Sequence, residues 1–209
     1  MSHPARHLSA LIERSEVLST TLEMAFSLPP FEGRPRYEAS QIAAALAFEH
    51  GAALRVLLLE GLGPSAAVVL RSQYEAALRS VWLCYCADES VTAAFASDLS
   101  NEDARLDKAL PQAAAMLAQI EASGPQVAAT SLANFRRTSW PALNSFVHAG
   151  LHPIKRQREG LPLALAKDLL RSSNGLSVIA AMQAAVSAGS QELVSAVANS
   201  QITFADCCP

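Results

Sequence analysis

The chain has 209 residues, of which 51% are hydrophobic and 17% charged, and its net charge is −3 at pH 7. This apolar share excludes a chain that is disordered throughout, and the acidic balance excludes a nucleic-acid binder that relies on an overall basic field, although it leaves room for a local basic patch. About 40 alanines and 28 leucines against 9 glycines favour helices.

Apolar residues recur at helical spacing in segments that are separated by breaks containing proline and glycine. In chain order, this pattern predicts helices over residues 5–27, 38–60, 64–87, 90–122, 126–137, 139–150, 163–172 and 174–199. The fourth is expected to bend near Pro111 and the last to break near Gly189, and residues 155–162 are expected to form a charged loop. The sequence shows neither an internal repeat nor a convincing pair of strands. It therefore predicts an all-α bundle of six to eight helices.

The helical pattern predicts one domain over residues 1–209. Within it we expect an N-terminal helical arm (1–30), a bundle (38–188) and a flexible tail (200–209). The first residues contain no uncharged apolar run of the kind that a secretory signal needs, and charged or amide side chains interrupt the most apolar stretches, 51–70 and 176–198. These features predict a cytoplasmic protein that does not enter a membrane.

The four cysteines, Cys84, Cys86, Cys207 and Cys208, have a spacing that fits neither a zinc knuckle nor a CxxC redox motif. We therefore expect a reduced protein. Two interpretations of the C-terminal pair stay open, namely ordinary thiols at a frayed end and a reactive or lipid-modified tail.

Three predicted helices carry polar side chains within apolar faces when residues are placed about 100° apart around the helix axis. These are His50, the pair Arg71 and Glu75, and the pair Asn144 and His148, and the members of each pair are one turn apart. Because a buried unpaired charge is strongly unfavourable, we expect these side chains to contact one another or water in the interior. Two interpretations stay open: a structural network and a shared functional site.

The segment around Asn144 and His148 is basic, although the chain as a whole is acidic. No acidic residue occurs between residues 136 and 158, and the cations there are Arg136, Arg137, Lys155, Arg156 and Arg158. This asymmetry predicts a site for an anion or a phosphate; the alternative is that charged residues simply gather at helix ends. His148 is a candidate general acid or base because imidazole titrates near neutral pH.

A metal site is the weaker alternative. His50, Glu75 and His148 are ligand types on three helices, but the Glu-x-x-His repeats of di-iron bundles are missing, which leaves only a mononuclear site. The sequence also lacks a Walker loop, a GxGxxG fingerprint and a GxSxG elbow. We therefore predict no metal and no cofactor.

Two segments, 70–83 (LRSQYEAALRSVWL) and 140–150 (WPALNSFVHAG), resemble a group of uncharacterised bacterial helical proteins that is similar to the HEPN superfamily (higher eukaryote and prokaryote nucleotide-binding domains). The resemblance covers residues 38–188. It implies a helical bundle that pairs into a homodimer, with polar side chains converging on a cleft. Many HEPN proteins are metal-independent ribonucleases of toxin–antitoxin or phage-defence systems.

The HEPN motif has an arginine, commonly followed by a polar residue, and a histidine four to six residues after the arginine. Asn144 and His148 match the polar and histidine positions, whereas Leu143 occupies the arginine position. Because leucine cannot stabilise a phosphate, the guanidinium would have to come from elsewhere in the chain. The candidates are Arg71, Arg136, Arg137 and Arg156.

The resemblance therefore implies a protein that binds or cleaves RNA or a nucleotide. In cleavage, the ribose 2′-hydroxyl would attack the adjacent phosphate, with His148 as the acid–base group and Asn144 orienting it. Arg71 would stabilise the anion and Glu75 would position Arg71, while His50 and the five cations would contribute to binding. The alternative is a non-catalytic helical dimer or protein-interaction module whose polar residues form a structural buried network.

Overall fold

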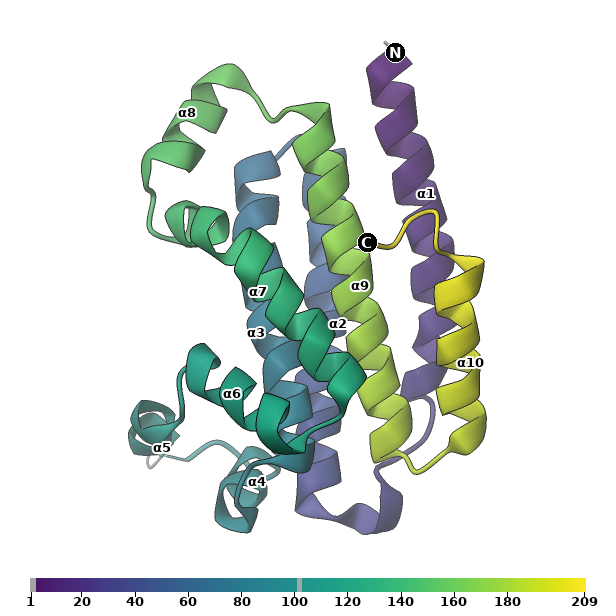
Figure 1. Ribbon diagram of the computed structural model, residues 1–209, viewed down its shortest axis with the longest axis vertical. Helices are drawn as coiled ribbons and strands as arrows, with labels where there is room; N and C mark the ends of the chain where they lie inside the picture. Colours follow the sequence, from purple (N-terminus) through teal and green to yellow (C-terminus); the bar gives the residue numbers. More distant parts are fainter. Residues whose placement is uncertain (1–2, 101–102) are drawn as a thin grey trace.

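The computed structural model describes residues 3–100 and 103–209, and every regular element within these ranges is helical (Figure 1). The ten α-helices found there are α1 (His3–Glu23), α2 (Pro35–Leu59), α3 (Gly63–Tyr85), α4 (Glu89–Phe95), α5 (Asp103–Ala109), α6 (Ala113–Ser123), α7 (Gln126–Val147), α8 (Leu151–Glu159), α9 (Leu163–Ser187) and α10 (Gln191–Thr203). Two short 3₁₀ segments, Met24–Phe26 and Phe31–Gly33, connect α1 to α2. The all-α prediction is confirmed for the described residues, but their helices exceed the predicted six to eight.

The extra helices come from two regions that the sequence pattern describes wrongly. Residues 90–122, predicted as one bent helix, contain the short helices α4, α5 and α6, with Pro111 between the last two. Residues 155–159, predicted as part of a charged loop, belong to α8. There Arg156 and Arg158 form ion pairs with Glu159, and basic residues in the last turn also favour a helix.

Two predicted interruptions, by contrast, are absent. α7 is continuous through Pro141, which removes one backbone hydrogen bond but leaves the helix held to the bundle by the buried Leu143 and Phe146 that follow. α9 is continuous through Asn174, because the side chain of this residue is buried and hydrogen-bonded. The predicted break near Gly189 is confirmed, and this residue has a φ of +69° between α9 and α10.

The helices α2, α3 and α9 pack against one another at the centre of the bundle. Large, fully buried side chains on them are Leu54, Leu70, Tyr74, Leu78 and Leu170. α1 and α10 cover α9, whereas α6 and α7 cover α3 (Figure 1). α1, for which the sequence predicts an arm, buries Ile12, Leu18 and Leu22 in the same core. As one of the central helices, α3 is the surface on which α7 packs.

The polar side chains buried most deeply are not those that the sequence pattern singled out. Gln73 Nε2 donates to the carbonyl oxygen of Ser173 (3.0 Å) and to Ser177 Oγ (3.1 Å), and Gln73 Oε1 accepts from Ser173 Oγ (2.7 Å). All three residues are buried. The network that joins α3 to α9 is therefore neutral, which avoids the desolvation penalty of buried charges.

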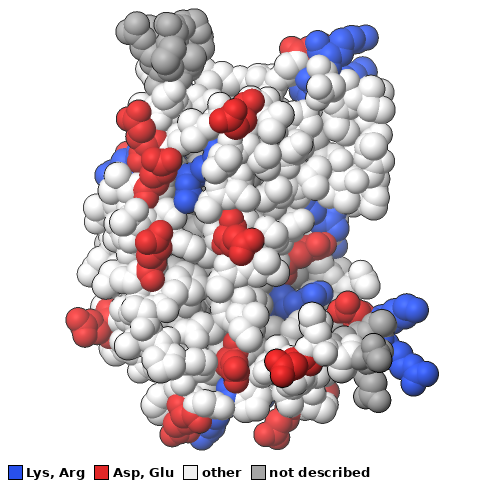
Figure 2. Space-filling model, turned by 180° about the vertical axis from the view of Figure 1, so that it is seen from behind, with Lys and Arg blue, Asp and Glu red and all other residues white. Residues whose placement is uncertain are grey.

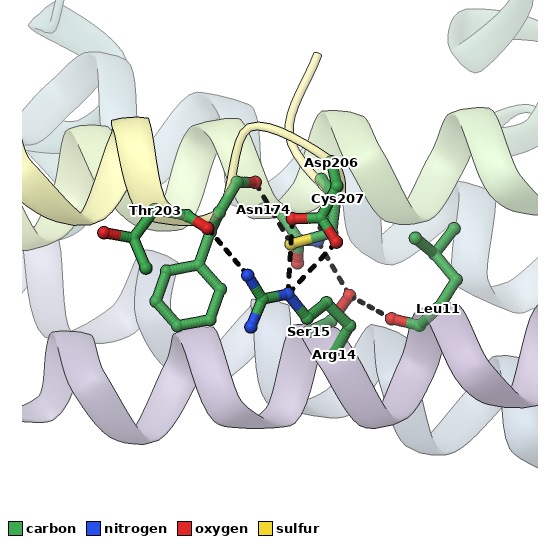
Figure 3. Close-up of polar contacts among 8 residues, drawn as sticks. Leu11, Arg14, Ser15, Asn174, Thr203, Asp206 and Cys207 are labelled. Carbon is green, nitrogen blue, oxygen red and sulfur yellow. Dashed lines mark hydrogen bonds and ion pairs between the residues drawn. The ribbon is translucent and has the colours of Figure 1, made fainter.

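Residues 200–209, for which the sequence predicts a flexible tail, complete α10 and then turn back beside α1 and α9 (Figure 3). Phe204 and Cys207 are buried. Asn174 Nδ2 donates to Ser15 Oγ of α1 and to the carbonyl oxygen of Cys207, both at 2.8 Å. One buried amide of α9 thus holds both α1 and the C-terminal segment.

α2 is the one helix of the described residues that is long and apolar enough to cross a membrane, judged by length and composition. A core helix of a soluble protein meets the same criterion, and α2 packs against α3 and α9. Its outer side exposes large apolar side chains: Ile42, Leu46, Val56 and Leu59. Figure 2 shows the molecule from behind, with wide uncharged areas, separate acidic side chains, and basic side chains at the two corners where α8 and α5 lie.

Candidate active site between α3 and α7

The helices α3 and α7 bring Arg71, Glu75 and Asn144 together. Arg71 donates to Glu75 Oε1 from Nε (3.1 Å) and Nη2 (2.9 Å), and it donates to Asn144 Oδ1 from Nη1 (2.9 Å). The Arg71 side chain is 14% exposed and that of Glu75 is 42% exposed. The guanidinium is therefore partly desolvated and held by an accessible carboxylate and an accessible amide. The predicted pair Arg71 and Glu75 thus lies together with Asn144, one member of the second predicted pair.

Trp140 of α7 joins two guanidinium groups at this place. Arg71 Cζ lies 3.4 Å from the centroid of the Trp140 ring, and Arg136 Cζ lies 4.3 Å from it. Each such cation–π contact contributes about 0.5 to 2 kcal/mol, more when it is desolvated. Arg136, Trp140 and Asn144 are spaced one turn apart, so they form a line along one face of α7. Arg71 and Arg136 thus bring two positive charges to this place, and Glu75 brings one negative charge.

A buried tyrosine supports the tryptophan. The ring of Tyr74 stacks on Phe135 with centroids 4.7 Å apart and meets Trp140 edge-on at 5.6 Å. Neither the Tyr74 hydroxyl nor Arg136 Nη1, both buried, has a hydrogen-bond partner. Burial raises the pKa of Tyr74 to about 12, and the nearby Arg136 opposes part of that rise. Buried aromatic rings thus support Trp140 beneath the two guanidinium groups.

His148 lies at the end of α7 and is exposed, rather than in the interior as its spacing predicts. α7 ends at Val147, and the backbone N–H of His148 donates to the carbonyl oxygen of Asn144 (3.2 Å). Ala149 then takes a left-handed φ of +50°, and the Gly150 N–H donates to the carbonyl oxygen of Ser145 (2.8 Å), which is the Schellman pattern of a helix end. The imidazole therefore projects into solvent one turn beyond the Arg71–Asn144 hydrogen bond.

His50 does not join this group. It is half-buried on α2 and makes no hydrogen bond or ion pair with Arg71, Glu75 or His148. In the described part of the chain, no three His, Cys, Asp or Glu side chains lie together as a metal site requires. The weaker alternative of a mononuclear metal held by His50, Glu75 and His148 therefore has no assembled ligand set.

The five cations predicted to bind an anion lie on two helices. Arg136 and Arg137 belong to α7, and Lys155, Arg156 and Arg158 belong to α8. Arg156 and Arg158 bind Glu159 at 3.8 and 2.8 Å, and this acid lies just beyond the stretch that contains only cations. Lys155 and Arg137 are exposed, and Arg137 donates to the side chain of Asn134 (3.1 Å). The positive character of α8 is thus partly neutralised, while that of α7 is retained.

The C-terminal thiols do not have the properties of reactive groups. Burial raises the pKa of Cys207, and it raises the pKa of Cys208 to about 12. A raised pKa keeps a thiol protonated near neutral pH and therefore weakly nucleophilic. These directions favour the interpretation as ordinary thiols over a reactive tail.

Sequence reasoning missed the aromatic part of the site, namely Trp140, Tyr74 and Phe135. The spacing of Arg136, Trp140 and Asn144 was a usable signal, since it places a cation, an aromatic ring and an amide on one helical face. Phe135 also lines a cavity of about 560 Å³ between α7, α9 and the C-terminal segment. No charged side chain lines that cavity, so it is unsuited to a phosphate.

No curated protein and no solved structure matches this chain significantly. A family model does match residues 44–209, a range that contains α3, α7 and every residue of the site between them. Its description is "Family of unknown function (DUF6988)". Because the match extends over most of the sequence, the chain belongs to the DUF6988 family.

Proposed function

We propose that this protein binds RNA or a nucleotide through a phosphate group at the α3–α7 site, as a HEPN-like, metal-independent ribonuclease with His148 as its acid–base group. The observation that carries the proposal is the 2.9 Å hydrogen bond from Arg71 Nη1 to Asn144 Oδ1. It places a guanidinium beside the turn that contains Asn144 and His148. Leu143, at the arginine position of the HEPN motif, is 3% exposed and packs in the core. A toxin or phage-defence role rests on the resemblance alone.

The remaining hydrogen-bond donors support phosphate binding. A guanidinium has five N–H groups, and Arg71 uses three of them on Glu75 and Asn144. Two N–H groups of Arg71 therefore remain for phosphate oxygens, and Arg136, on the same tryptophan ring, adds a second positive charge close by. Bidentate arginine–phosphate contacts are among the stronger hydrogen bonds in proteins. Trp140 holds both guanidinium groups in place before a ligand arrives.

In the proposed reaction, the ribose 2′-oxygen attacks the adjacent phosphorus while His148 accepts the 2′-hydroxyl proton. The bond from phosphorus to the 5′-oxygen breaks, and a proton returned from the imidazole leaves a 5′-hydroxyl end and a 2′,3′-cyclic phosphate. Arg71 stabilises the charge that develops on the phosphate oxygens. Glu75 positions Arg71, and Asn144 links Arg71 to the end of α7 that presents His148.

The test is cleavage of a labelled single-stranded RNA in excess chelator by the wild type, His148→Ala and Arg71→Gln. His152→Ala is a matched control, because His152 is another exposed histidine, four residues further along the chain at the start of α8. We expect the wild type and His152→Ala to cleave alike. His148→Ala is expected to lose about 100-fold or more, the usual contribution of a general acid or base. Circular dichroism checks that each variant is folded.

Fluorescence anisotropy at several salt concentrations measures binding of the same RNA. It separates proposed RNA binding from proposed RNA cleavage. Weaker binding by Arg71→Gln together with unchanged binding by His148→Ala supports the assigned roles. Binding without any cleavage would overturn the ribonuclease and leave a binding protein. If the folded wild type neither binds nor cleaves RNA and does not bind mononucleotides, the proposed function is wrong.

The exposed apolar side of α2 favours a second candidate, a helical homodimer or interaction module. Ile42, Leu46, Val56 and Leu59 are each between 47% and 58% exposed. Successive members are four, ten and three residues apart, so at about 100° per residue the four side chains lie on one side of the helix, as one stripe. A two-fold axis would bring this stripe against the same stripe of a second copy.

Light scattering after gel filtration tests the homodimer with Leu46→Glu, which places a carboxylate in the stripe. Val127→Glu is the control, because Val127 is 77% exposed on α7 and lies outside the stripe. A dimeric wild type, a dimeric Val127→Glu and a monomeric Leu46→Glu support pairing through α2. A wild type that stays monomeric at about 100 µM, far above a micromolar Kd, would reject it.

A further inference from the structure

A second basic pocket lies between α1, α9 and the C-terminal segment, away from the α3–α7 site. It has a volume of about 220 Å³ and is lined by His7, Ala10, Leu11, Arg14, Lys167, Arg171 and Asp206. Figure 1 shows α9 between α1 and α7, so this pocket opens on a different part of the surface. Three permanent cations and one carboxylate line it, which makes it positively charged.

Arg14 is fixed in this pocket by several contacts, as Figure 3 shows. Its Nε donates to both carboxylate oxygens of Asp206 (3.2 and 3.1 Å), and its Nη2 donates to the carbonyl oxygen of Thr203 (2.7 Å). Its Cζ also lies 4.2 Å from the centroid of the Phe204 ring. None of these contacts uses Nη1. The guanidinium is thus held in one orientation with N–H groups left over for a ligand.

The two cations of α9 give the pocket an excess of positive charge. Lys167 and Arg171 are one turn apart and half-buried, and neither forms an ion pair with a described residue. The hydrogen bond from Arg14 lowers the pKa of Asp206, so this carboxylate is ionised near neutral pH and neutralises one of the three cations. Two positive charges therefore remain uncompensated around this pocket.

We propose that this pocket binds the dianionic phosphoryl group of a phosphate monoester or of inorganic phosphate, through Arg14, Lys167 and Arg171. A phosphoryl group supplies about −1.5 to −2 charges at pH 7 and several acceptor oxygens, which matches the two uncompensated cations and their N–H groups better than a carboxylate does. A volume of about 220 Å³ is sufficient for the phosphoryl group, and the rest of a monoester would extend into solvent. This site is independent of RNA binding between α3 and α7.

Isothermal titration calorimetry in chloride buffer, with inorganic phosphate and with glycerol 3-phosphate as probes, tests the proposal. We expect one saturable site in the wild type. The double variant Lys167→Gln/Arg171→Gln is expected to weaken binding at least about tenfold, because charge-assisted hydrogen bonds are lost. Arg105→Gln/Lys108→Gln on α5 removes the same charge elsewhere and is expected to bind like the wild type.

Asp206→Asn gives the sharper test, because this substitution is expected to strengthen phosphate binding, whereas Lys167→Gln/Arg171→Gln weakens it. The amide keeps the size and one acceptor for Arg14 but removes the only negative charge of the lining, so phosphate should bind several-fold more tightly. A purely structural Arg14–Asp206 pair would give no such gain. Absence of wild-type binding, or equal weakening by the α5 control, would overturn the proposal. If glycerol 3-phosphate binds more tightly than inorganic phosphate, the ligand is a phosphorylated small molecule. If inorganic phosphate binds more tightly, the ligand is the free ion.

Discussion

Replacement of Tyr74 by alanine is expected to lower the free energy of unfolding by about 3 to 5 kcal/mol, whereas replacement by phenylalanine is expected to leave it unchanged or raise it. The Tyr74 ring is fully buried and stacks on Phe135, so alanine leaves a large cavity. The hydroxyl forms no hydrogen bond in the structure, and Arg136 is the cation close to it, so phenylalanine removes a buried polar atom and gives up only its interaction with Arg136. Urea unfolding of the three proteins measures both differences. A loss of more than about 1 kcal/mol for Tyr74→Phe would mean that the hydroxyl is bonded in solution.

The same residue makes stability depend on alkaline pH. Burial raises the pKa of Tyr74 to about 12, above the value of about 10 in an unfolded chain, so the native state holds the phenol proton more tightly. The corresponding stability is complete below pH 10 and is lost as the pH rises towards 12, by roughly 2 to 3 kcal/mol. Tyr74→Phe should lack this loss. The raised pKa values of Tyr85 and Cys208 affect both proteins alike, so the comparison isolates Tyr74. Parallel stability curves over this range would contradict the prediction.

The helical class was predictable because alanine and leucine recur at helical spacing over most of the chain. The helix boundaries were harder to predict, because proline and asparagine act differently in different surroundings. Pro111 does separate two helices, whereas Pro141 lies inside α7. Burial of Leu143 and Phe146 after Pro141 stabilises the continuous helix, and burial depends on tertiary packing that local patterns do not contain. Asn174 is a similar case, since its partners Ser15 and Cys207 are far away in sequence.

For the candidate site, contacts within one helix were predictable from the sequence, but contacts between helices were not. The one-turn spacing of Arg71 and Glu75 correctly indicates an intrahelical ion pair. The hydrogen bond from Arg71 to Asn144 joins α3 to α7, and the packing of two helices does not follow from their sequences alone. His148 shows the opposite error: spacing places it on the face of Asn144, but α7 ends one residue earlier and exposes the imidazole. A site that depends on a helix end is sensitive to a boundary that sequence patterns locate poorly.

Replacement of Gly51 by valine is expected to lower the free energy of unfolding by about 3 kcal/mol. Gly51 is buried on α2, and a Cβ there would lie 2.6 Å from Ser177 Oγ and 2.9 Å from Gln73 Nε2. These atoms belong to the amide–hydroxyl network between α3 and α9, so they cannot retreat without losing hydrogen bonds. Ala52→Val changes the next, exposed residue and is expected to stay within about 0.5 kcal/mol of the wild type.

A double-mutant cycle shows whether this close approach is the cause. Ser177→Ala removes the Oγ nearest to the new side chain, so Gly51→Val should be less destabilising by about 1 kcal/mol in that background. If Gly51→Val lowers the free energy of unfolding equally in both backgrounds, the contact with Ser177 is not the cause of the destabilisation. If valine prevents folding, Gly51→Ala replaces it in the same cycle. Coupling would establish that α2 packs closely on the neutral polar network that joins α3 to α9. The charged side chains of α3 then lie at the edge of the core, where Arg71 reaches α7.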